Sequence, residues 1–338
     1  MDRGGSAAPP PAQNDRDPAP LALLLLHNEQ FRSTIAGGIA GCVSAVVTCP
    51  LDLVKIRLQN RRLGAPASPG TLGLLTSIFR DEGLRGLYRG VVPTLCGYLP
   101  TWAIYFTVYD WGKSAFPSAL GKADPDSLTH MLSAISAGLV STAATNPFWV
   151  IRTRVMTQPA RPTPNAPYYY TSIINAFTTI LRLEGPKALY KGLTPSLIGV
   201  SHVALQFPLY ERLKSGIKDR NLEQTGAASI GTPGILLASA LSKMTASLIT
   251  YPHEVIRTRL QTQSIATPTA FGRFPLPKYR GILQTARTIL IEEGEKAFYK
   301  GFSVNLLRTV PASALTIWTY EVVLRKLTLW VQTQNRGG

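Results

Sequence analysis

The sequence predicts an all-α membrane protein with six transmembrane helices, built from three tandem repeats with three-fold pseudosymmetry. Charged residues make up only 16% of the chain, against about 25% in soluble domains. Six apolar stretches occur near residues 32–58, 89–113, 130–156, 190–213, 235–260 and 300–324. Each is long enough to cross a bilayer, which takes about 20 residues. Three short motifs also recur three times in the same order, which is the signature of a repeat protein.

The repeated motifs define the units. The first reads "TCPLDLVKIR", "TNPFWVIRTR" and "TYPHEVIRTR", around Pro50, Pro147 and Pro252. The second reads "EGLRGLYRG", "EGPKALYKG" and "EGEKAFYKG", and the third "YDWGK", "YERLK" and "YEVVLR". We therefore expect repeats at residues 30–116, 127–217 and 232–328. A Pro/Ala-rich N-terminal tail at 1–29, expected to be disordered, and a C-terminal tail at 329–338 flank them.

The first motif places charges at the end of each first helix, where the proline is expected to break or kink the helix. Two copies carry an acid two residues after the proline, Asp52 and Glu254, whereas the middle copy carries Trp149. In a three-fold ring, an acid of one repeat can face a base of the next, so forming and breaking these pairs would gate a pathway. The alternative is a set of charges that snorkel to the membrane interface.

Composition limits the partners. The net charge is +16, and a surplus of this size usually means a nucleic acid, an anionic membrane or an anionic substrate. No nucleic-acid-reading motif or zinc-finger spacing is present, so a nucleic-acid partner is not expected. The three cysteines lack CxxC spacing, and no metal or cofactor is expected. Without a phosphate-binding loop motif, the sequence gives no support for an enzyme.

Polar residues inside the apolar stretches are the candidate substrate contacts. A full charge within a span costs several kcal/mol unless it is compensated, and a phosphate would compensate Lys243 and Arg308. The alternative is that each pairs with a nearby carbonyl or helix end. Two interpretations of His202 fit equally well: a contact to a base or ribose of the substrate, or a histidine satisfied inside the protein. Trp102 could stack on a base or pack against lipid or the protein core. The remaining candidates are Gln206, Thr101 and Gly97, whose missing side chain is expected to leave space for a substrate.

Together these motifs resemble the signature of the mitochondrial carrier family, over about residues 30 to 328. The resemblance implies six tilted helices around a three-fold pseudo-axis in the inner mitochondrial membrane, with both termini toward the intermembrane space. It also implies alternating access between a matrix-side and a cytoplasmic-side ring of ion pairs. A carrier of this kind is expected to be a monomer in contact with membrane lipid, with cardiolipin as a candidate.

Carried over by motif position, the resemblance assigns two rings. The matrix ring would pair Asp52 with Arg152 and Glu254 with Lys55. Arg257 would lack an ionic partner because Trp149 replaces the third acid, and a ring face stacked on its guanidinium is an option. Gln59 and Gln261 match the glutamine that braces such pairs, whereas the second copy has Met156. The cytoplasmic ring would hold Asp110, Lys113, Glu211, Lys214 and Glu321, with the pairs Asp110–Lys214 and Glu321–Lys113.

Within the family, "PTWAIYF", "SKMTAS" and "NLLRTVPASA" resemble the branch that carries NAD, pyrimidine nucleotides, FAD and folate, and the NAD transporters above all. This resemblance implies import of NAD into the matrix in exchange for adenine nucleotides such as AMP. A pyrimidine nucleotide, FAD or folate carrier of the same branch is the alternative. An adaptor that has the carrier fold but does not transport is the alternative from another class.

Overall fold

The computed structural model describes residues 29–61, 70–121, 126–159, 169–225, 232–263 and 278–336, and these residues form helices and no strand. All of the expected N-terminal tail except Glu29 lies outside the described residues. Contacts divide the chain into two units, one made of residues 1–40 and 316–338 and the other of residues 41–315. The second unit contains the candidate site.

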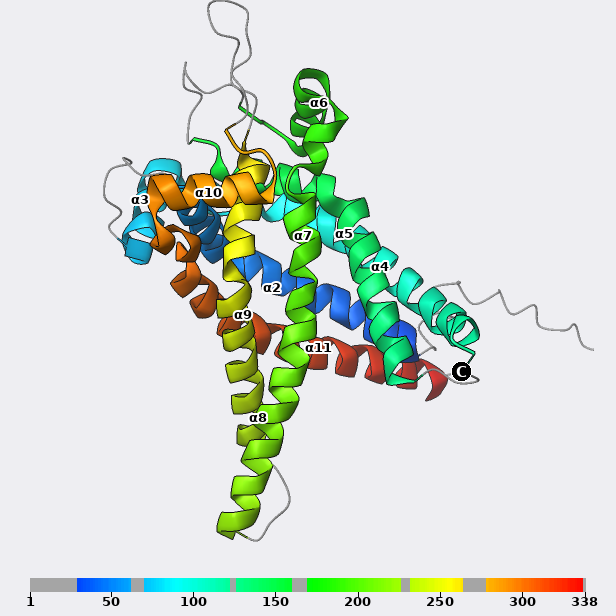
Figure 1. Cartoon of the computed structure of the whole chain (residues 1–338). Coiled ribbons are helices and arrows are strands. Elements are labelled where there is room, and N and C mark those ends of the chain that lie inside the picture. Colours follow the sequence, from blue (N-terminus) through cyan, green and yellow to red (C-terminus); the bar gives the residue numbers. More distant parts are fainter. Residues whose placement is uncertain are drawn as a thin grey trace, which may run out of the picture. The chain divides into compact units, whose positions relative to one another are not determined.

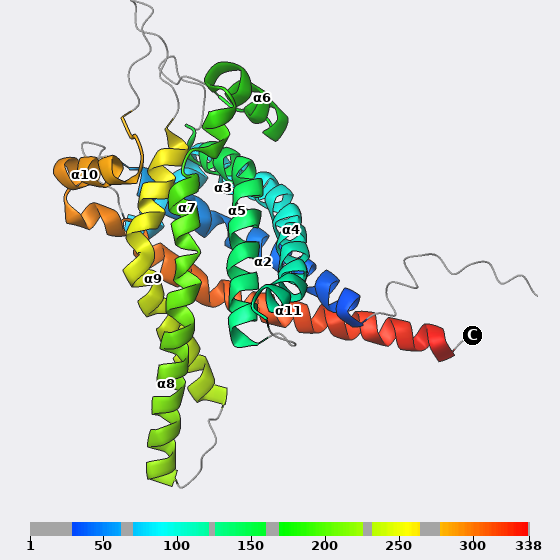
Figure 2. The same cartoon turned by 45° about the vertical axis from the view of Figure 1, so that its right-hand side comes forward.

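Six long helical segments correspond to the six predicted spans. They are α2 (Glu29–Asn60), α4 (Val91–Ala119), α5 (Ser127–Thr157), α7 (Leu193–Gly199) followed by α8 (Ser201–Thr225), α9 (Thr232–Thr262) and α11 (Phe302–Arg336). In the unit of residues 41–315, α4 lies along α5, and α8 lies along α9 (Figures 1 and 2). The described part of the predicted C-terminal tail is helical, because α11 continues to Arg336.

The prolines of the first motif do not end their helices. Pro50, Pro147 and Pro252 lie inside α2, α5 and α9, and each helix continues for ten residues beyond its proline. The expected break is therefore wrong, and a kink at these prolines stays a prediction. The remaining i→i−4 hydrogen bonds on both sides sustain the helix across the one donor that a proline removes.

The fourth predicted span is divided in two. Val200 separates α7 from α8, although its backbone stays helical with φ −62° and ψ −29°. Its N–H donates to the carbonyl of Leu197 at 3.1 Å, one residue closer than in an α-helix. The interruption is thus a tightened turn rather than a bend to a new direction.

Within the part of the chain that the structure describes, three helices are long and apolar enough to cross a membrane by composition: Arg32–Asn60, Val91–Ala119 and Leu128–Thr157. Of the other predicted spans, α9 with 31 residues and α11 with 35 are also long enough, but they are more polar. In α9 the polar character comes partly from Lys243, Glu254 and Arg257, which line cavities. Charges within a span are expected to face the protein interior in this way.

Three short helices join the long ones within the repeats: α3 (Gly70–Leu87), α6 (Ile173–Glu184) and α10 (Ile282–Glu293). They lie at one end of the unit of residues 41–315, toward the top of Figures 1 and 2. The glycines of the second motif, Gly83, Gly185 and Gly294, have φ values of 67°, 79° and 76°. Only glycine adopts this conformation without strain, which explains why each repeat has a glycine after the motif's glutamate.

A buried ion cluster, here called a bracket, ties the first motif to the second in each repeat. The arginine that closes the first motif binds the glutamate of the second, in the pairs Arg57–Glu82 at 2.5 Å, Arg154–Glu184 at 2.6 Å and Arg259–Glu293 at 2.8 Å. The same glutamates also bind the base that ends the second motif, Arg89, Lys191 and Lys300 respectively. The three brackets lie at equivalent positions of the three repeats.

The bracket arginines also connect neighbouring repeats. Each donates its Nε–H to a main-chain carbonyl of the next repeat: Arg57 to Met156 at 3.1 Å, Arg154 to Gln261 at 3.0 Å and Arg259 to Gln59 at 2.6 Å. The third contact leads back to the first repeat, so the three repeats close into a ring. Three small hydrophobic clusters, built around Leu53, Ile180 and Ile289, surround these contacts.

The residues described in the other unit form the start of α2 and the end of α11. Within this unit the hydroxyl groups of Ser33 and Tyr320 are hydrogen bonded at 2.8 Å.

Gly301→Ala should destabilise the closed ring of repeats. Gly301 has φ +83°, and a Cβ there would lie 3.2 Å from both the Lys55 carbonyl oxygen and the Tyr251 hydroxyl. We expect a loss of about 1–3 kcal/mol, measured as a lower thermal unfolding temperature. Gly216→Ala in α8 is the control, since nothing lies within 4 Å of its Cβ position. Equal effects of the two substitutions would contradict this account.

Candidate functional site

Two cavities lie side by side in the unit of residues 41–315, because they share lining residues. The smaller has a volume of about 300 Å³ and the larger about 450 Å³. Lys55, Glu254, Arg257 and Arg308 line both. Because these are mostly residues of the predicted matrix ring, the cavities lie against that ring.

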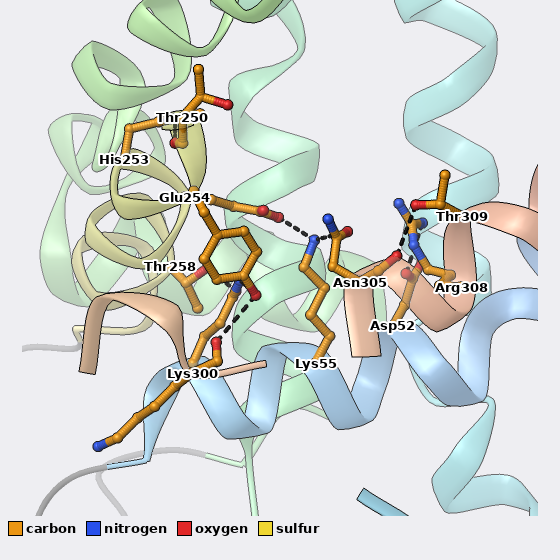
Figure 3. A network of polar contacts seen from close by, with 12 residues as sticks. Asp52, Lys55, Thr250, His253, Glu254, Thr258, Lys300, Asn305, Arg308 and Thr309 are labelled. Atoms are coloured by element: carbon orange, nitrogen blue, oxygen red, sulfur yellow. Dashed lines mark hydrogen bonds and ion pairs between the residues drawn. The ribbon is translucent and has the colours of Figure 1, made fainter. Parts of the chain in front are cut away.

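The two expected ion pairs of the matrix ring are both formed. Arg152 donates to the Asp52 carboxylate at 2.7 Å, and Lys55 binds Glu254. Each base has a second acceptor: Lys55 donates to Asn305 Oδ1 at 2.8 Å, and Arg152 Nε donates to Thr94 Oγ1 at 2.7 Å. Figure 3 shows Lys55 between Glu254 and Asn305. Because the pairs join α2 to α9 and α2 to α5, they connect all three repeats.

Arg308 joins the same network. Its Nη1 lies 2.8 Å from Asp52 Oδ1, while Arg152 occupies Oδ2 of that carboxylate. Figure 3 shows Arg308 extending from α11 toward Asp52. Its charge was predicted to await a phosphate or to pair with a carbonyl or a helix end. The structure instead compensates it with a ring carboxylate.

Arg257 stands apart from the other ring residues. No hydrogen bond or ion pair joins it to any other residue within the described ranges, and its Nε is buried without an acceptor. Glu254, the nearest acid of its own motif, is engaged by Lys55. This agrees with the expectation that Trp149 leaves Arg257 without an ionic partner.

The stacking partner of Trp149 differs from the one considered above. The guanidinium of Arg152 lies 5.6 Å from the Trp149 ring centroid, and Tyr98 meets the indole edge-on at 5.8 Å. The indole N–H donates to Thr145 Oγ1, four residues earlier, at 3.2 Å. The indole therefore packs against Arg152 of its own helix, one turn away, and the interaction with Arg257 is not formed.

The two glutamines contact polar groups other than the ring pairs. Gln59 accepts from Thr258 at 2.8 Å and donates to the Tyr251 hydroxyl at 3.0 Å. Gln261 accepts from Thr153 at 2.9 Å, and its Nε2 is buried without an acceptor. The expectation that they brace the ion pairs directly is wrong, since Gln59 of α2 contacts α9 and Gln261 of α9 contacts α5 through other polar groups.

Two acids of the predicted cytoplasmic ring, Asp110 and Glu211, pair within their own helices in this structure. Asp110 binds Lys113 at 3.0 Å and Glu211 lies 3.9 Å from Lys214, both three residues apart on one helix. The expected pair Asp110–Lys214 is therefore absent. The two acids are well exposed, with side-chain accessibilities of 59% and 65%. The base three residues further along the same helix is the neighbour that each acid reaches most easily. Glu321 belongs to the unit of residues 316–338, and its pairing with Lys113 stays a prediction.

Lys243 and His202 both line the larger cavity. Lys243 forms no hydrogen bond or ion pair with any residue that the structure describes. His202 Nδ1 lies 3.0 Å from Thr250 Oγ1, so the histidine has a partner inside the protein. Of the two interpretations of His202, this contact favours a satisfied interior histidine over a substrate contact. Gln206, four residues further on, lines neither cavity.

Of the three candidates on α4, only Thr101 lines a cavity, the smaller one. Gly97 was expected to leave space for a substrate. A Cβ at Gly97 would instead lie 3.3 Å from Phe148 Cβ, so this glycine permits the close packing of α4 on α5. Trp102 lines neither cavity, is 49% exposed, and stacks on Phe106 with ring centroids 5.7 Å apart.

Trp102→Leu should therefore leave transport nearly unchanged. The ring contacts residues of its own helix, and substitutions away from buried partners shift energies by about 0.5 kcal/mol or less. We expect exchange rates in liposomes within about twofold of the wild type. A loss of more than tenfold at normal membrane insertion would restore Trp102 as a substrate contact.

Sequence reasoning missed Asn305, Thr94 and the brackets. Asn305 precedes Arg308 by three residues, which puts both on one helix face. This spacing could have indicated that Asn305 lies near the same site as Arg308. The bracket partners stand in two motifs that each recur three times, so their pairing was open to deduction. The contact of Thr94 with Arg152, 58 residues later in the chain, left no signal in the sequence.

The family comparison decides what kind of chain this is. The model of the mitochondrial carrier protein family matches three times, at residues 27–119, 124–221 and 229–329. The chain belongs to the mitochondrial carrier family. Its six-helix carrier fold follows from this membership and from the all-helical structure.

Several named carriers are similar to this one. Mitochondrial nicotinamide adenine dinucleotide transporter 1 of Saccharomyces cerevisiae is 42% identical over 300 residues, covering 87% of this chain and 77% of that protein. Nicotinamide adenine dinucleotide transporter 2, mitochondrial, of Arabidopsis thaliana is 40% identical, covering 86% and 78%. The mitochondrial pyrimidine nucleotide transporter RIM2 of Saccharomyces cerevisiae is 35% identical, covering 87% and 85%.

Proposed function

We propose that this mitochondrial carrier imports NAD into the matrix in exchange for adenine nucleotides. The observation that carries the proposal is the similarity to two NAD transporters at 40% identity or more over most of the chain. The site supports it chemically. Lys243 borders the larger cavity without an ion-pair partner among the described residues, and a pyrophosphate would compensate such a half-buried charge.

The two rings support an alternating-access cycle. The matrix ring carries two cross-repeat ion pairs, whereas Asp110 and Glu211 of the other ring pair only within their own helices. This combination fits a conformation closed on the matrix side and ready for substrate from the other side. In the proposed cycle the matrix pairs break after substrate binds. Buried pairs cost desolvation whenever they are remade, so two pairs make an easier gate than three.

The proposal includes a place for the protein: the inner mitochondrial membrane, as a monomer in contact with lipid, with both termini toward the intermembrane space. Membership in a family of carriers supports transport rather than an enzymatic reaction.

Exchange in liposomes tests the substrate. Purified protein is inserted into liposomes loaded with AMP, and uptake of labelled NAD is compared with uptake of labelled pyrimidine nucleotides, FAD and folate. We expect NAD to be taken up fastest. Robust pyrimidine nucleotide exchange without NAD uptake would move the assignment to the carriers represented by the 35% identical relative.

The same assay addresses a non-transporting adaptor. An adaptor has no need of an uncompensated cation in a cavity, so Lys243→Ala would leave its activity intact. Loss of exchange in Lys243→Ala, with normal insertion into the membrane, rules the adaptor out.

A further inference from the structure

Arg257 lines the smaller cavity and is a second cation without an ion-pair partner among the described residues. We propose that Arg257 is an anion-binding residue of this carrier, which takes a phosphate group of the substrate at the position where the ring lacks its third acid. The identity of the substrate rests on the proposed function. The binding of a phosphate or pyrophosphate group does not.

Two hydrogen-bond donors point to an acceptor that the chain itself does not provide. Arg257 Nε and Gln261 Nε2 are both buried without a hydrogen-bond partner. Both residues line the smaller cavity, and they lie four residues apart on α9. Leaving a buried donor unpaired is costly, more so for a charged group. The oxygens of a phosphate are acceptors that would satisfy both donors at once.

The charge balance of the cavities also requires an anion. Five cationic side chains line the two cavities against two carboxylates, a surplus of three; they are Lys55, Arg152, Arg257, Arg308 and Lys243, against Asp52 and Glu254. Lys55, Arg152 and Arg308 are each held by a carboxylate. The cations without a carboxylate are therefore Arg257 and Lys243. A pyrophosphate carries enough negative charge to offset both.

Trp149 explains why Arg257 is available. The residue two positions after the proline is an acid in the first and third repeats, Asp52 and Glu254, and each acid pairs with a base of another repeat. With Trp149 in the second repeat, Arg257 keeps the position of a ring base but has no ring acid. The indole lines the smaller cavity and packs on Arg152 instead. The missing acid thus becomes a site for an anion from outside the chain.

Thermal unfolding with inorganic pyrophosphate tests the inference without assuming a substrate. A ligand that binds the folded state raises the unfolding temperature in a concentration-dependent way. We expect wild-type protein to be stabilised, and Arg257→Gln to need at least roughly tenfold more pyrophosphate for the same shift. Lys218→Gln, an exposed charge deletion on α8, should behave as the wild type.

Two variants of Trp149 keep the test decisive if Arg257→Gln fails to fold. Trp149→Asp offers Arg257 an ionic partner and should weaken pyrophosphate binding at least roughly tenfold. Trp149→Leu removes the ring without adding charge and should keep the wild-type response. Equal pyrophosphate responses in wild type, Arg257→Gln and Trp149→Asp would overturn the inference.

The outcome is separable from that of the proposed function. Pyrophosphate stabilisation that depends on Arg257, in a protein that exchanges no NAD, keeps this site and rejects the NAD assignment. If the protein exchanges NAD but its pyrophosphate response is unchanged in Arg257→Gln and Trp149→Asp, the NAD assignment stands and this site is rejected.

Discussion

Glu293→Gln is expected to lower the thermal unfolding temperature of the purified carrier strongly. Glu293 and Arg259 form a bracket pair at 2.8 Å with side-chain accessibilities of 1% and 0%, and Lys300 binds the same carboxylate. Removing one member of a buried pair leaves an uncompensated charge and costs about 3–5 kcal/mol. Arg259 also holds the carbonyls of Gln59 and Arg61, so the loss extends to the contact between the third and first repeats.

The neighbouring residue provides a matched control. Glu292 pairs with Lys278 at 2.5 Å, but the two side chains are 45% and 34% accessible. Exposed pairs contribute about 0–1 kcal/mol, so Glu292→Gln should shift the unfolding temperature little. If both glutamine variants unfold at the wild-type temperature, the bracket does not hold the repeats together.

The brackets also predict how stability depends on pH. Burial alone would raise the pKa of Glu293, but the hydrogen bond from Lys300 and the charge of Arg259 outweigh it, and the pKa lies below its ordinary value. The pKa of Glu184 is lowered for the same reasons, against burial, by Arg154 and Lys191. A lowered carboxyl pKa adds stability above the unfolded-state pKa, and this is lost as the pH falls through the folded-state value. Unfolding temperatures should therefore fall in acid, and less so in Glu293→Gln.

Lys243→Ala is expected to reduce NAD exchange by roughly 10- to 150-fold, through a higher KM. A hydrogen bond to a charged group contributes about 1.5–3 kcal/mol, and each 1.4 kcal/mol corresponds to about tenfold in binding. Lys243 lines the larger cavity and has no partner among the described residues, so its removal should cost little stability. Initial rates in liposomes over a range of NAD concentrations measure the effect.

Lys218→Ala deletes the same charge from an exposed position of α8 and should exchange NAD at the wild-type rate. Wild-type kinetics in Lys243→Ala would remove this residue from the binding site.

The repeats made much of this fold predictable. Motifs that recur at equal spacing indicate which acids and bases occupy equivalent positions, and the resemblance to the carrier family then supplied the pairing order Asp52–Arg152 and Lys55–Glu254. The same pattern marked Arg257 as the base without an acid. Helix existence was also predictable, because six apolar stretches of sufficient length stand out in a chain poor in charge.

Features that break the repeat were not predictable. Gly97 was read as open space, but the side chain that approaches it comes from Phe148, 51 residues later, and packing between helices leaves no local signal. The pairing of Arg308 with Asp52 has no counterpart in the repeat pattern. The expected cytoplasmic pair Asp110–Lys214 is absent for another reason: motif positions define which pairs can form, whereas the conformation decides which do.

Uptake of labelled NAD by liposomes tests the central claim most directly. A carrier that alternates access around one site and exchanges NAD for adenine nucleotides should take up NAD rapidly into AMP-loaded liposomes and slowly into empty ones. We predict this difference for the wild type and its near loss in Lys243→Ala. If correctly inserted wild-type protein takes up no NAD against internal AMP, while other nucleotides exchange or none do, the account of an NAD carrier is contradicted.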